Sequence, residues 1–369
     1  VQEWEDFKWM KVANLRTKEG IEAWNNHAAQ VYVINYESLT KIVDQLIAGR
    51  NPRELPVDSV VFDEISVAKS TKSKRMKHFR KHASNKFERR HGLTGTPTPN
   101  SYEDLFAQSL LIDNGETFGK YITHFQKRFF KVSNPWSDYP KYEPVEGGAD
   151  AIEKAMAHMT LTQRSEDHLK IPPTQIIDVL VTLCSDSRKA YKKIEKELFL
   201  ELKSGDRIKA PTVAAMGQKL LQLTGGAIYT VDENDNRTGY ETFNQLKIDQ
   251  LRKLAKKHKT LLVACNFRHE VKRIVDELGA VEFSTELLSD WNKGKIKILV
   301  ANPKSISHGL NMQHGGSTIV WYGPTYSRET YDQFNARLAR TGQKHETTIY
   351  RLIATKTIDE TVIEALRMK

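Results

Sequence analysis

Cysteine is scarce in this sequence, since Cys184 and Cys265 are its only two and no Cys-x-x-Cys spacing occurs. Nothing therefore indicates a disulfide framework or a zinc site. Long hydrophobic runs are also missing, because no apolar stretch approaches the roughly 18 residues that a membrane span needs. No charged start followed by an apolar stretch indicates a signal peptide. We therefore expect a cytoplasmic protein without a membrane partner.

Acidic residues are outnumbered: Lys and Arg total 56 against 46 Asp and Glu, for a formal net charge of +10. From net charge alone, a nucleic-acid partner and the absence of any anionic partner are about equally open. The distribution of charge is more informative, since residues 69–90 hold ten cations and one acid, Glu88. A solvated helix face usually mixes signs, so this segment favours contact with a polyanion.

Short β-rich apolar runs alternate with helical patterns along the chain. This alternation is typical of parallel strands covered by helices on both faces. The predicted strands span residues 31–34, 57–62, the run into Leu93, 176–183, 260–265, 296–301, 318–322 and 348–353. The predicted helices include residues 248–258, 269–278 and 329–339. Two α/β units fit this pattern best.

Two breaks interrupt the alternation. Residues 134–150 carry three prolines and paired glycines, which predict a loop inside a helical insertion of about residues 113–165. Pro172 and Pro173 hold the backbone extended before strand 176–183 and indicate a hinge. We therefore expect one domain over residues 1–170 and a second over 171–369. Residues 232–239, rich in Asn and Asp, are expected to form a surface turn.

Two adjacent acids, Asp63 and Glu64, directly follow a predicted buried strand. In an open α/β sheet, ligands sit beyond the carboxyl ends of the strands, where catalytic acids belong. Further along, Thr94, Gly95 and Thr96 follow another short strand. The glycine permits close backbone approach, and the hydroxyls can hydrogen-bond an anion or the acids. Alone, the acids would more often be a solvated or capping pair and the glycine a plain turn, so the joint pattern carries the hypothesis.

Arginines in the second half form a matching pattern, Gln-x-x-x-Arg-x-x-Arg-x-Gly-Gln, from Gln333 to Gln343. Arg337 and Arg340 are three residues apart, so on a helix they share one face and both guanidinium groups can reach a single phosphate site. The alternative for two arginines alone is a pair of surface ion-pair partners.

Together these segments resemble the motifs of superfamily 2 helicase-like ATPases of the Swi/Snf type. The acid pair and the Leu-Thr-Gly-Thr-Pro run resemble motifs II and III, and the arginine pattern resembles motif VI. Residues 305–311, with His308, Gly309 and Asn311, resemble motif V. Residues 115–120 and 308–316 are most similar to compact DEAD/DEAH-box-type helicases encoded by bacteriophages, which implies the host cytoplasm as the location.

The resemblance implies an α/β fold of two RecA-like domains, with ATP and Mg²⁺ as cofactors. It implies that Asp63 holds Mg²⁺ through water and that Glu64 polarises the attacking water. Arg337 and Arg340 would stabilise charge on the γ-phosphate. The residues implied to contact the nucleotide are Asp63, Thr94, Gly95, Thr96, Gly309, Gln333 and Gln343.

The implied function is an ATP-dependent DNA helicase or double-stranded DNA translocase. DNA would be held through its backbone, so that binding depends on salt and little on sequence. The candidate DNA contacts are Lys69, Lys72, Lys74, Lys77, Lys81, His308 and Asn311. The alternative is a motor-derived module that grips DNA without turning over ATP.

The sequence departs from the family pattern in one major respect: no G-x-x-x-x-G-K-[ST] phosphate loop occurs. Residues 115–120 have one residue too few between their glycines and are followed by Tyr121. Because the chain opens at Val1 in a segment that follows that loop in the family, we expect a first domain truncated at its N-terminus and inactive alone. Ile65 and Ser66 replace the Ala-His that is common after the acids.

Overall fold

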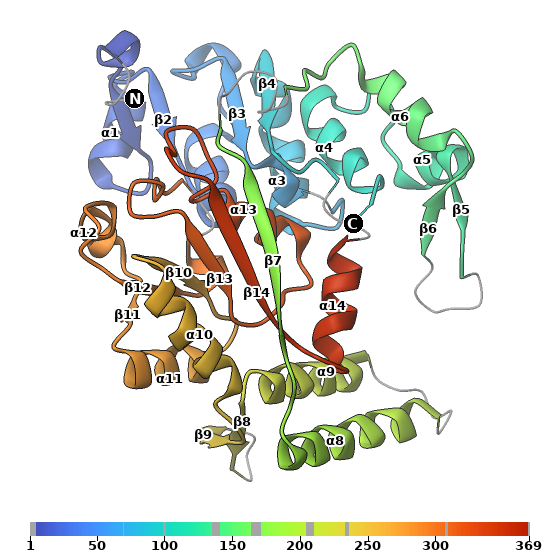
Figure 1. Cartoon of the computed structure of the whole chain (residues 1–369). Helices are drawn as coiled ribbons and strands as arrows, with labels where there is room; N and C mark the ends of the chain where they lie inside the picture. Colours follow the sequence, from blue (N-terminus) through green and yellow to red (C-terminus); the bar gives the residue numbers. More distant parts are fainter. Residues whose placement is uncertain are drawn as a thin grey trace. The chain divides into compact units, whose positions relative to one another are not determined.

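The computed structural model describes residues 5–68, 70–98, 101–134, 141–163, 171–203, 210–232, 236–306 and 309–367. The chain divides into two compact units, residues 1–162 and 163–369 (Figure 1). Both units contain parallel strands and helices, so the predicted α/β class is confirmed. The expected domain limit at residue 170 stays a prediction, because residues 164–170 lie outside the described part of the chain.

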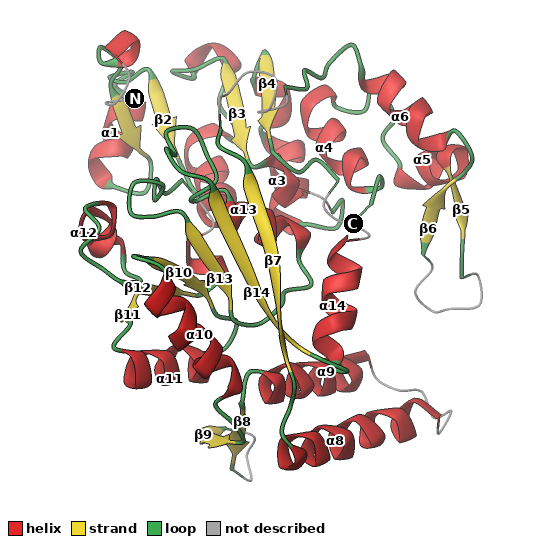
Figure 2. Ribbon diagram, viewed as in Figure 1, coloured by secondary structure: helices red, strands yellow, loops and turns green. Residues whose placement is uncertain are grey.

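The second unit is built on a six-stranded parallel sheet (Figure 2). The strands, in spatial order, are β11 (Val281–Glu282), β12 (Ile298–Ala301), β10 (Leu261–Ala264), β13 (Thr318–Trp321), β14 (Thr347–Ala354) and β7 (Thr174–Val181). Every residue of β10, β12 and β13 is buried. Burial on both faces explains why these strands read as unbroken apolar runs.

Helices cover both faces of this sheet. Val263 of β10 packs in one cluster with α10 (Leu246–Lys257) and α11 (Arg268–Leu278). Its neighbour Leu262 packs in the opposite cluster with α12 (Leu288–Asn292), α13 (Arg328–Asn335) and α14 (Ile358–Arg367). Successive residues of a strand point to opposite faces, so the two clusters confirm the predicted two-sided cover.

A smaller group of elements follows β7. It contains α8 (Ser185–Lys203), α9 (Ala210–Thr224) and an antiparallel hairpin of β8 (Ala227–Val231) and β9 (Arg237–Thr242). The prediction of a surface turn over residues 232–239 was wrong at its end, because β9 begins at Arg237. β9 is mostly exposed and polar, so it lacks the apolar signal of a buried strand.

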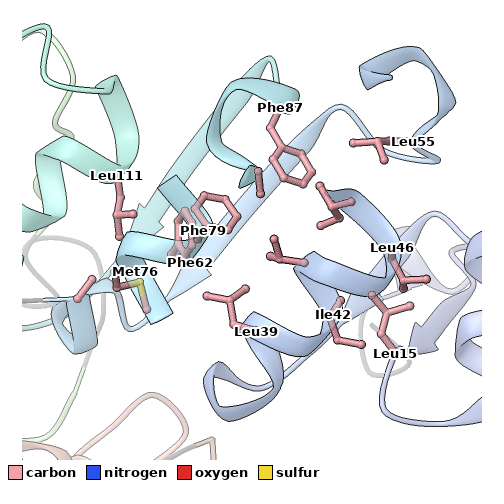
Figure 3. Packing of buried hydrophobic residues seen from close by; sticks show 14 of the residues in the cluster. Leu15, Leu39, Ile42, Leu46, Leu55, Phe62, Met76, Phe79, Phe87 and Leu111 are labelled. Atoms are coloured by element: carbon pink, nitrogen blue, oxygen red, sulfur yellow. The ribbon is translucent and has the colours of Figure 1, made fainter. Parts of the chain in front are cut away.

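The first unit contains two parallel pairs of strands, β1 (Val12–Asn14) with β2 (Val31–Val33), and β3 (Ser59–Asp63) with β4 (Arg89–Leu93). The helices α1 (Lys18–Asn25), α2 (Leu39–Ile42) and α3 (Lys74–His82) complete it. Figure 3 shows the core, in which Phe79 of α3 lies against Phe62 of β3 with ring centroids 5.1 Å apart. This packing fixes the end of β3, where the acid pair lies.

Among the described residues, β2 and β3 each pair along one edge only. Residues of both strands line one cavity of about 1120 Å³. On the strands, Val33 is 49% and Val61 is 56% exposed. The described part of this unit therefore leaves apolar strand surface uncovered, in contrast to the second unit.

The predicted helical insertion, about residues 113–165, contains α5 (Ile122–Phe129) and α6 (Gly148–Met156). These helices pack with α4 (Asp104–Asp113), which precedes the predicted limit, around a core that includes Phe106 and Phe125. The prediction of a loop over residues 134–150 was partly wrong. β5 (Phe130–Val132) pairs with β6 (Tyr142–Pro144), and α6 begins within the paired glycines. Gly147, with φ of +70°, caps this helix, so the glycines start a helix instead of prolonging a loop.

Candidate functional site: acids, hydroxyls and arginines at strand ends

The acid pair and the threonine segment meet at the carboxyl ends of β3 and β4. Asp63 is paired in register with Leu93, so the two strands end at the same level. Beyond that level, the Thr94 hydroxyl donates a hydrogen bond to Glu64 Oε1 at 2.6 Å. Ser66 donates to the same oxygen at 2.8 Å. Glu64 Oε2 has no hydrogen-bond partner among the described residues and remains available.

Thr94 also links the acids to the next turn. Its hydroxyl oxygen accepts a hydrogen bond from the Thr96 backbone N–H at 3.1 Å while donating to Glu64. The Thr96 hydroxyl oxygen is buried without a partner among the described residues. Gly95 has open space where a Cβ would lie. The predicted bonding of a hydroxyl to the acids is therefore present, through Thr94.

Tyr36, which the sequence reasoning did not select, also lies at this site. Its hydroxyl donates to the backbone carbonyl of Asp63 at 2.8 Å. Burial raises the pKa of Tyr36 to about 12, with further contributions from the charges of Asp63 and Glu64. The phenol therefore stays protonated and acts as a donor. Its signal in the sequence is a tyrosine two residues beyond the predicted strand 31–34, close to a strand end.

The Asp63 side chain is exposed and has no hydrogen-bond or ion-pair partner among the described residues. Mg²⁺ keeps several waters and is usually bound by one or two carboxylates together with substrate phosphates. A single exposed carboxylate at a strand end fits that mode of binding. Groups of three or more His, Cys, Asp or Glu side chains suited to a metal do not occur in the described ranges.

The Ile65 side chain explains why glycine stands at position 92 of the neighbouring strand β4. A Cβ added at Gly92 would lie 2.5 Å from Ile65 Cδ1. Gly92 therefore lets the buried Ile65 approach β4 directly. The departure from the family pattern at Ile65 is thus accommodated by packing next to the acids.

In the second unit, Arg337 and Arg340 converge on one atom. Their guanidinium groups donate to the Leu310 carbonyl at 3.4 and 3.1 Å respectively. The expected helix over residues 329–339 was wrong at its end, since α13 stops at Asn335 and both arginines lie in the turns that follow. Short-range bonds such as Arg337 N–H to the Phe334 carbonyl tighten the chain there and replace the helical pattern.

Gly309 and Asn311 flank that carbonyl. Gly309 has φ of +67°, a conformation that favours glycine, and Asn311 is exposed. The run predicted as motif V and the run predicted as motif VI therefore meet at Leu310. His308 lies outside the described residues, so its predicted role stays a prediction.

Of the two glutamines of the predicted nucleotide site, Gln343 holds the fold through its side chain and Gln333 through its backbone carbonyl. The buried Gln343 amide donates to the carbonyls of Gln313, Gly316 and Leu338, at 3.2, 2.9 and 3.2 Å. The Gln333 carbonyl accepts from Arg337 Nε at 2.8 Å. Their predicted contacts with a nucleotide stay predictions.

The basic segment forms α3 and its surroundings. Met76 and Phe79 are buried, whereas Lys74, Lys77 and Lys81 are exposed at spacings of three and four residues, which places them on one stripe of the helix. Lys72, just before α3, is also exposed. Lys69 lies outside the described residues.

Other cations of this segment serve the fold. Arg90 donates to the carbonyls of Ile112, Ser84 and Phe87. Lys86 donates to the Arg50 carbonyl. The count of ten cations therefore overstates the positive surface, which includes the exposed lysines on and beside α3 and the exposed Arg89.

The family model for the SNF2-related domain matches residues 12–224, more than half of the chain. The chain therefore belongs to the SNF2-related family. This confirms the predicted resemblance to helicase-like ATPases of the Swi/Snf type. Within the described part of the chain, the helices are too short or too polar to cross a membrane.

The chain is similar to putative protein p41 of Acyrthosiphon pisum secondary endosymbiont phage 1, with 32% identity over 99% of this chain and 82% of the phage protein. It is 22% identical to the ISWI chromatin-remodeling complex ATPase ISW1 of Saccharomyces cerevisiae, over 75% of this chain and 26% of the yeast protein. The solved SWI2/SNF2 ATPase core of Sulfolobus solfataricus in complex with dsDNA is 16% identical, with a TM-score of 0.40 over 100% of this chain and 78% of that chain. Because that score is below 0.5, the family assignment rests on the sequence matches.

Proposed function

We propose that this chain works as part of an ATP-driven motor that moves on double-stranded DNA, as a translocase or a helicase. The observation that carries the proposal is the hydrogen bond between Thr94 and Glu64, which joins two motif segments at the carboxyl ends of adjacent parallel strands. Ligands of open α/β sheets bind beyond those ends. Membership of the SNF2-related family and similarity to a chromatin-remodeling ATPase support ATP and DNA as the ligands.

Each acid has a separate role in this proposal. Asp63, whose carboxylate has no partner among the described residues, would hold Mg²⁺ through water. Glu64 is oriented by the hydroxyls of Thr94 and Ser66, which both use Oε1 and leave Oε2 to polarise the attacking water. A carboxylate held by two donors has its geometry set before the reaction, which is what positioning of a nucleophile requires.

The arginines act on the phosphate in this proposal. Arg337 and Arg340 are already directed toward one place by the Leu310 carbonyl, and they stabilise the charge that develops on the γ-phosphate. Thr94 and Thr96 pass the state of the nucleotide to the DNA-binding surface. Gly95, Gly309, Gln333 and Gln343 complete the proposed nucleotide contacts.

DNA contacts come from the exposed lysines Lys72, Lys74, Lys77 and Lys81 and from Asn311, with Lys69 and His308 as further candidates. Lysines on a helical stripe neutralise backbone phosphates without reading bases. Binding in this proposal is therefore salt-dependent and similar for all sequences.

A second candidate function is supported by one observation, the lack of G-x-x-x-x-G-K-[ST] in these 369 residues. That loop supplies backbone N–H groups, a lysine and a hydroxyl to the phosphates and Mg²⁺. Without them a bound triphosphate loses most of its anchor. The 369 residues by themselves are then a DNA-binding module with little ATP turnover.

The hydrogen bond from Thr94 to Glu64 is tested in a longer version of the protein that carries a phosphate loop. Thr94→Val removes the donor and should lower DNA-stimulated phosphate release by at least tenfold, the order of magnitude that one well-placed group contributes to catalysis. Thr94→Ser keeps the hydroxyl and is the matched control. Release by Thr94→Val at the unmodified rate would remove this bond from the mechanism.

A further inference from the structure

A second cavity lies in the second unit, lined by residues of the β8–β9 hairpin and of α11. Its volume is about 510 Å³, within the range of roughly 300 to 1,000 Å³ that is usual for small-ligand sites. None of the residues assigned to ATP or DNA above lines it. The cavity is therefore separate from the proposed ATP and DNA sites.

Two tyrosines form one wall. Tyr229 of β8 and Tyr240 of β9 are directly opposite each other in the antiparallel register, so they lie on the same face of the hairpin. The His269 ring of α11 packs against both, with ring centroids 4.9 Å from Tyr229 and 5.9 Å from Tyr240. The two tyrosines and the buried His269 thus form one aromatic cluster.

A cationic side chain lies near each tyrosine ring. The Arg237 guanidinium lies 4.3 Å from the centroid of the Tyr229 ring, and the Lys272 ammonium lies 6.0 Å from that of Tyr240. Both side chains are exposed, and neither makes an ion pair within the described part of the chain. The third cation at the cavity, Arg268, is paired with Glu282. Arg237 and Lys272 therefore have charge available for an anionic ligand, opposed at the cavity wall by Asp276.

The third feature of the cavity is the buried side chain of His269. It is 1% exposed, and neither ring nitrogen has a hydrogen-bond partner among the described residues. Burial, followed by the charges of Arg273 and Arg237, lowers its pKa to about 4, so the ring is neutral at pH 7. A neutral imidazole has one donor and one acceptor, and both are unused here.

We propose that this cavity binds one unpaired nucleotide of a single-stranded nucleic acid. The base stacks on the tyrosine wall, and its phosphate lies beside Arg237 and Lys272. Unstacked bases are typically held by aromatic rings and cationic side chains in this way. The buried His269 ring packs against both tyrosines and helps to hold them in place. An inorganic phosphate would leave the tyrosines unused, and an apolar ligand would leave the cations unused.

This site goes beyond the proposed function, which concerns duplex DNA and the lysines of the first unit. An unpaired strand held on the second unit would give the protein a contact with melted or displaced nucleic acid. The two proposals are separable, because they rest on different residues and on different forms of the ligand.

The test is fluorescence anisotropy of the 369-residue chain with a labelled short oligothymidylate and with an abasic oligomer of the same length. The chain should bind the thymidylate about tenfold more tightly, which is the order of magnitude that stacking of one base contributes. Tyr240→Leu should remove that difference and leave abasic binding unchanged. Arg237→Gln with Lys272→Gln should weaken both oligomers.

Tyr240→Phe keeps the ring and should retain the preference, and Tyr121→Leu, at a 66% exposed tyrosine outside the cavity, is the matched control. Equal affinity of the unmodified chain for the two oligomers would overturn the proposal without any variant. An unchanged preference for the thymidylate in the Tyr240→Leu variant would also overturn the proposal. The Tyr240 variants should bind duplex DNA as tightly as the unmodified chain does. A failure of the proposed duplex contact at α3 can therefore be distinguished from a failure of the single-strand site.

Discussion

At the scale of single residues, Glu64 combines an uncommon backbone with a fixed carboxylate. Its φ is +51°, in the left-handed region that few residues other than glycine adopt. Such conformations cost about 1–3 kcal/mol and persist where neighbouring contacts hold them. The hydroxyls of Thr94 and Ser66 are such contacts. An observed strain of this kind at a strand end supports a functional role for the acid.

The first prediction concerns this acid in the loop-bearing protein. Glu64→Gln keeps the size of the side chain and removes the charge that polarises water, so phosphate release should be abolished while ATP binding stays nearly intact. Turnover and nucleotide binding are measured on the same preparation. Glu88→Gln, at an exposed acid of the same unit, is the control. Turnover near the unmodified rate would remove Glu64 from its role.

The second prediction concerns Arg340. An arginine that stabilises the transferring phosphoryl group contributes about 10³ to 10⁵ in rate, so Arg340→Ala should lower kcat by orders of magnitude. Steady-state ATP hydrolysis with saturating DNA measures this, with the exposed Lys344→Ala as control. A loss smaller than tenfold would assign Arg340 to a structural contact with the Leu310 carbonyl.

Residue types with chemistry of their own could be predicted from the sequence, and others could not. The acids and Thr94 were selected because charge or a hydroxyl at a strand end indicates a site, and the two arginines because their spacing lets both reach one phosphate site. The Leu310 carbonyl, where the arginines converge, was not selected, because a backbone acceptor has no signature in the sequence. Tyr36 was missed because an aromatic residue after a strand is more often core.

At the scale of elements, burial decided what could be predicted. β10, β12 and β13 were predicted because each is wholly buried and apolar. β9 was missed because it is exposed and polar, and β1 because only its middle residue is buried. The end of α13 was missed because the residues after Asn335 continue the helical pattern of the sequence, whereas short-range bonds there set a turn.

The third prediction concerns α3. Neutralising Lys72, Lys74, Lys77 and Lys81 to Gln should weaken DNA binding similarly for all sequences. It should also flatten the dependence of log K on log salt, by up to about one unit for each DNA phosphate that is no longer neutralised by a lysine. Affinity is measured on one duplex across a salt series.

The matched control for this prediction neutralises the same number of exposed lysines on α8, namely Lys189, Lys192, Lys193 and Lys196. It changes net charge equally, so an equal decrease in slope would attribute the effect to overall charge and not to α3. An unchanged slope in the α3 variant would show that its lysines face solvent only.

At the scale of the whole molecule, the two units differ in how far their sheets are covered. The second unit has helices on both faces of six paired strands. The described strands of the first unit form three separate pairs, with Val33 and Val61 half-exposed and a cavity lined by β2 and β3. The acids of the proposed mechanism lie in this less covered unit. Positioning of the nucleotide at the acids should therefore depend on contacts that the described residues of the first unit do not supply.

The most direct test of the central claim is DNA-stimulated phosphate release by the 369-residue chain beside a longer version that carries a phosphate loop. The longer version should hydrolyse ATP at a rate that double-stranded DNA raises. The 369 residues alone should bind DNA but release phosphate at the background rate, because positioning of the triphosphate is most of what such enzymes contribute. Equal and robust release by both proteins would contradict the assignment of the nucleotide site, and no release by the longer version would contradict the motor itself.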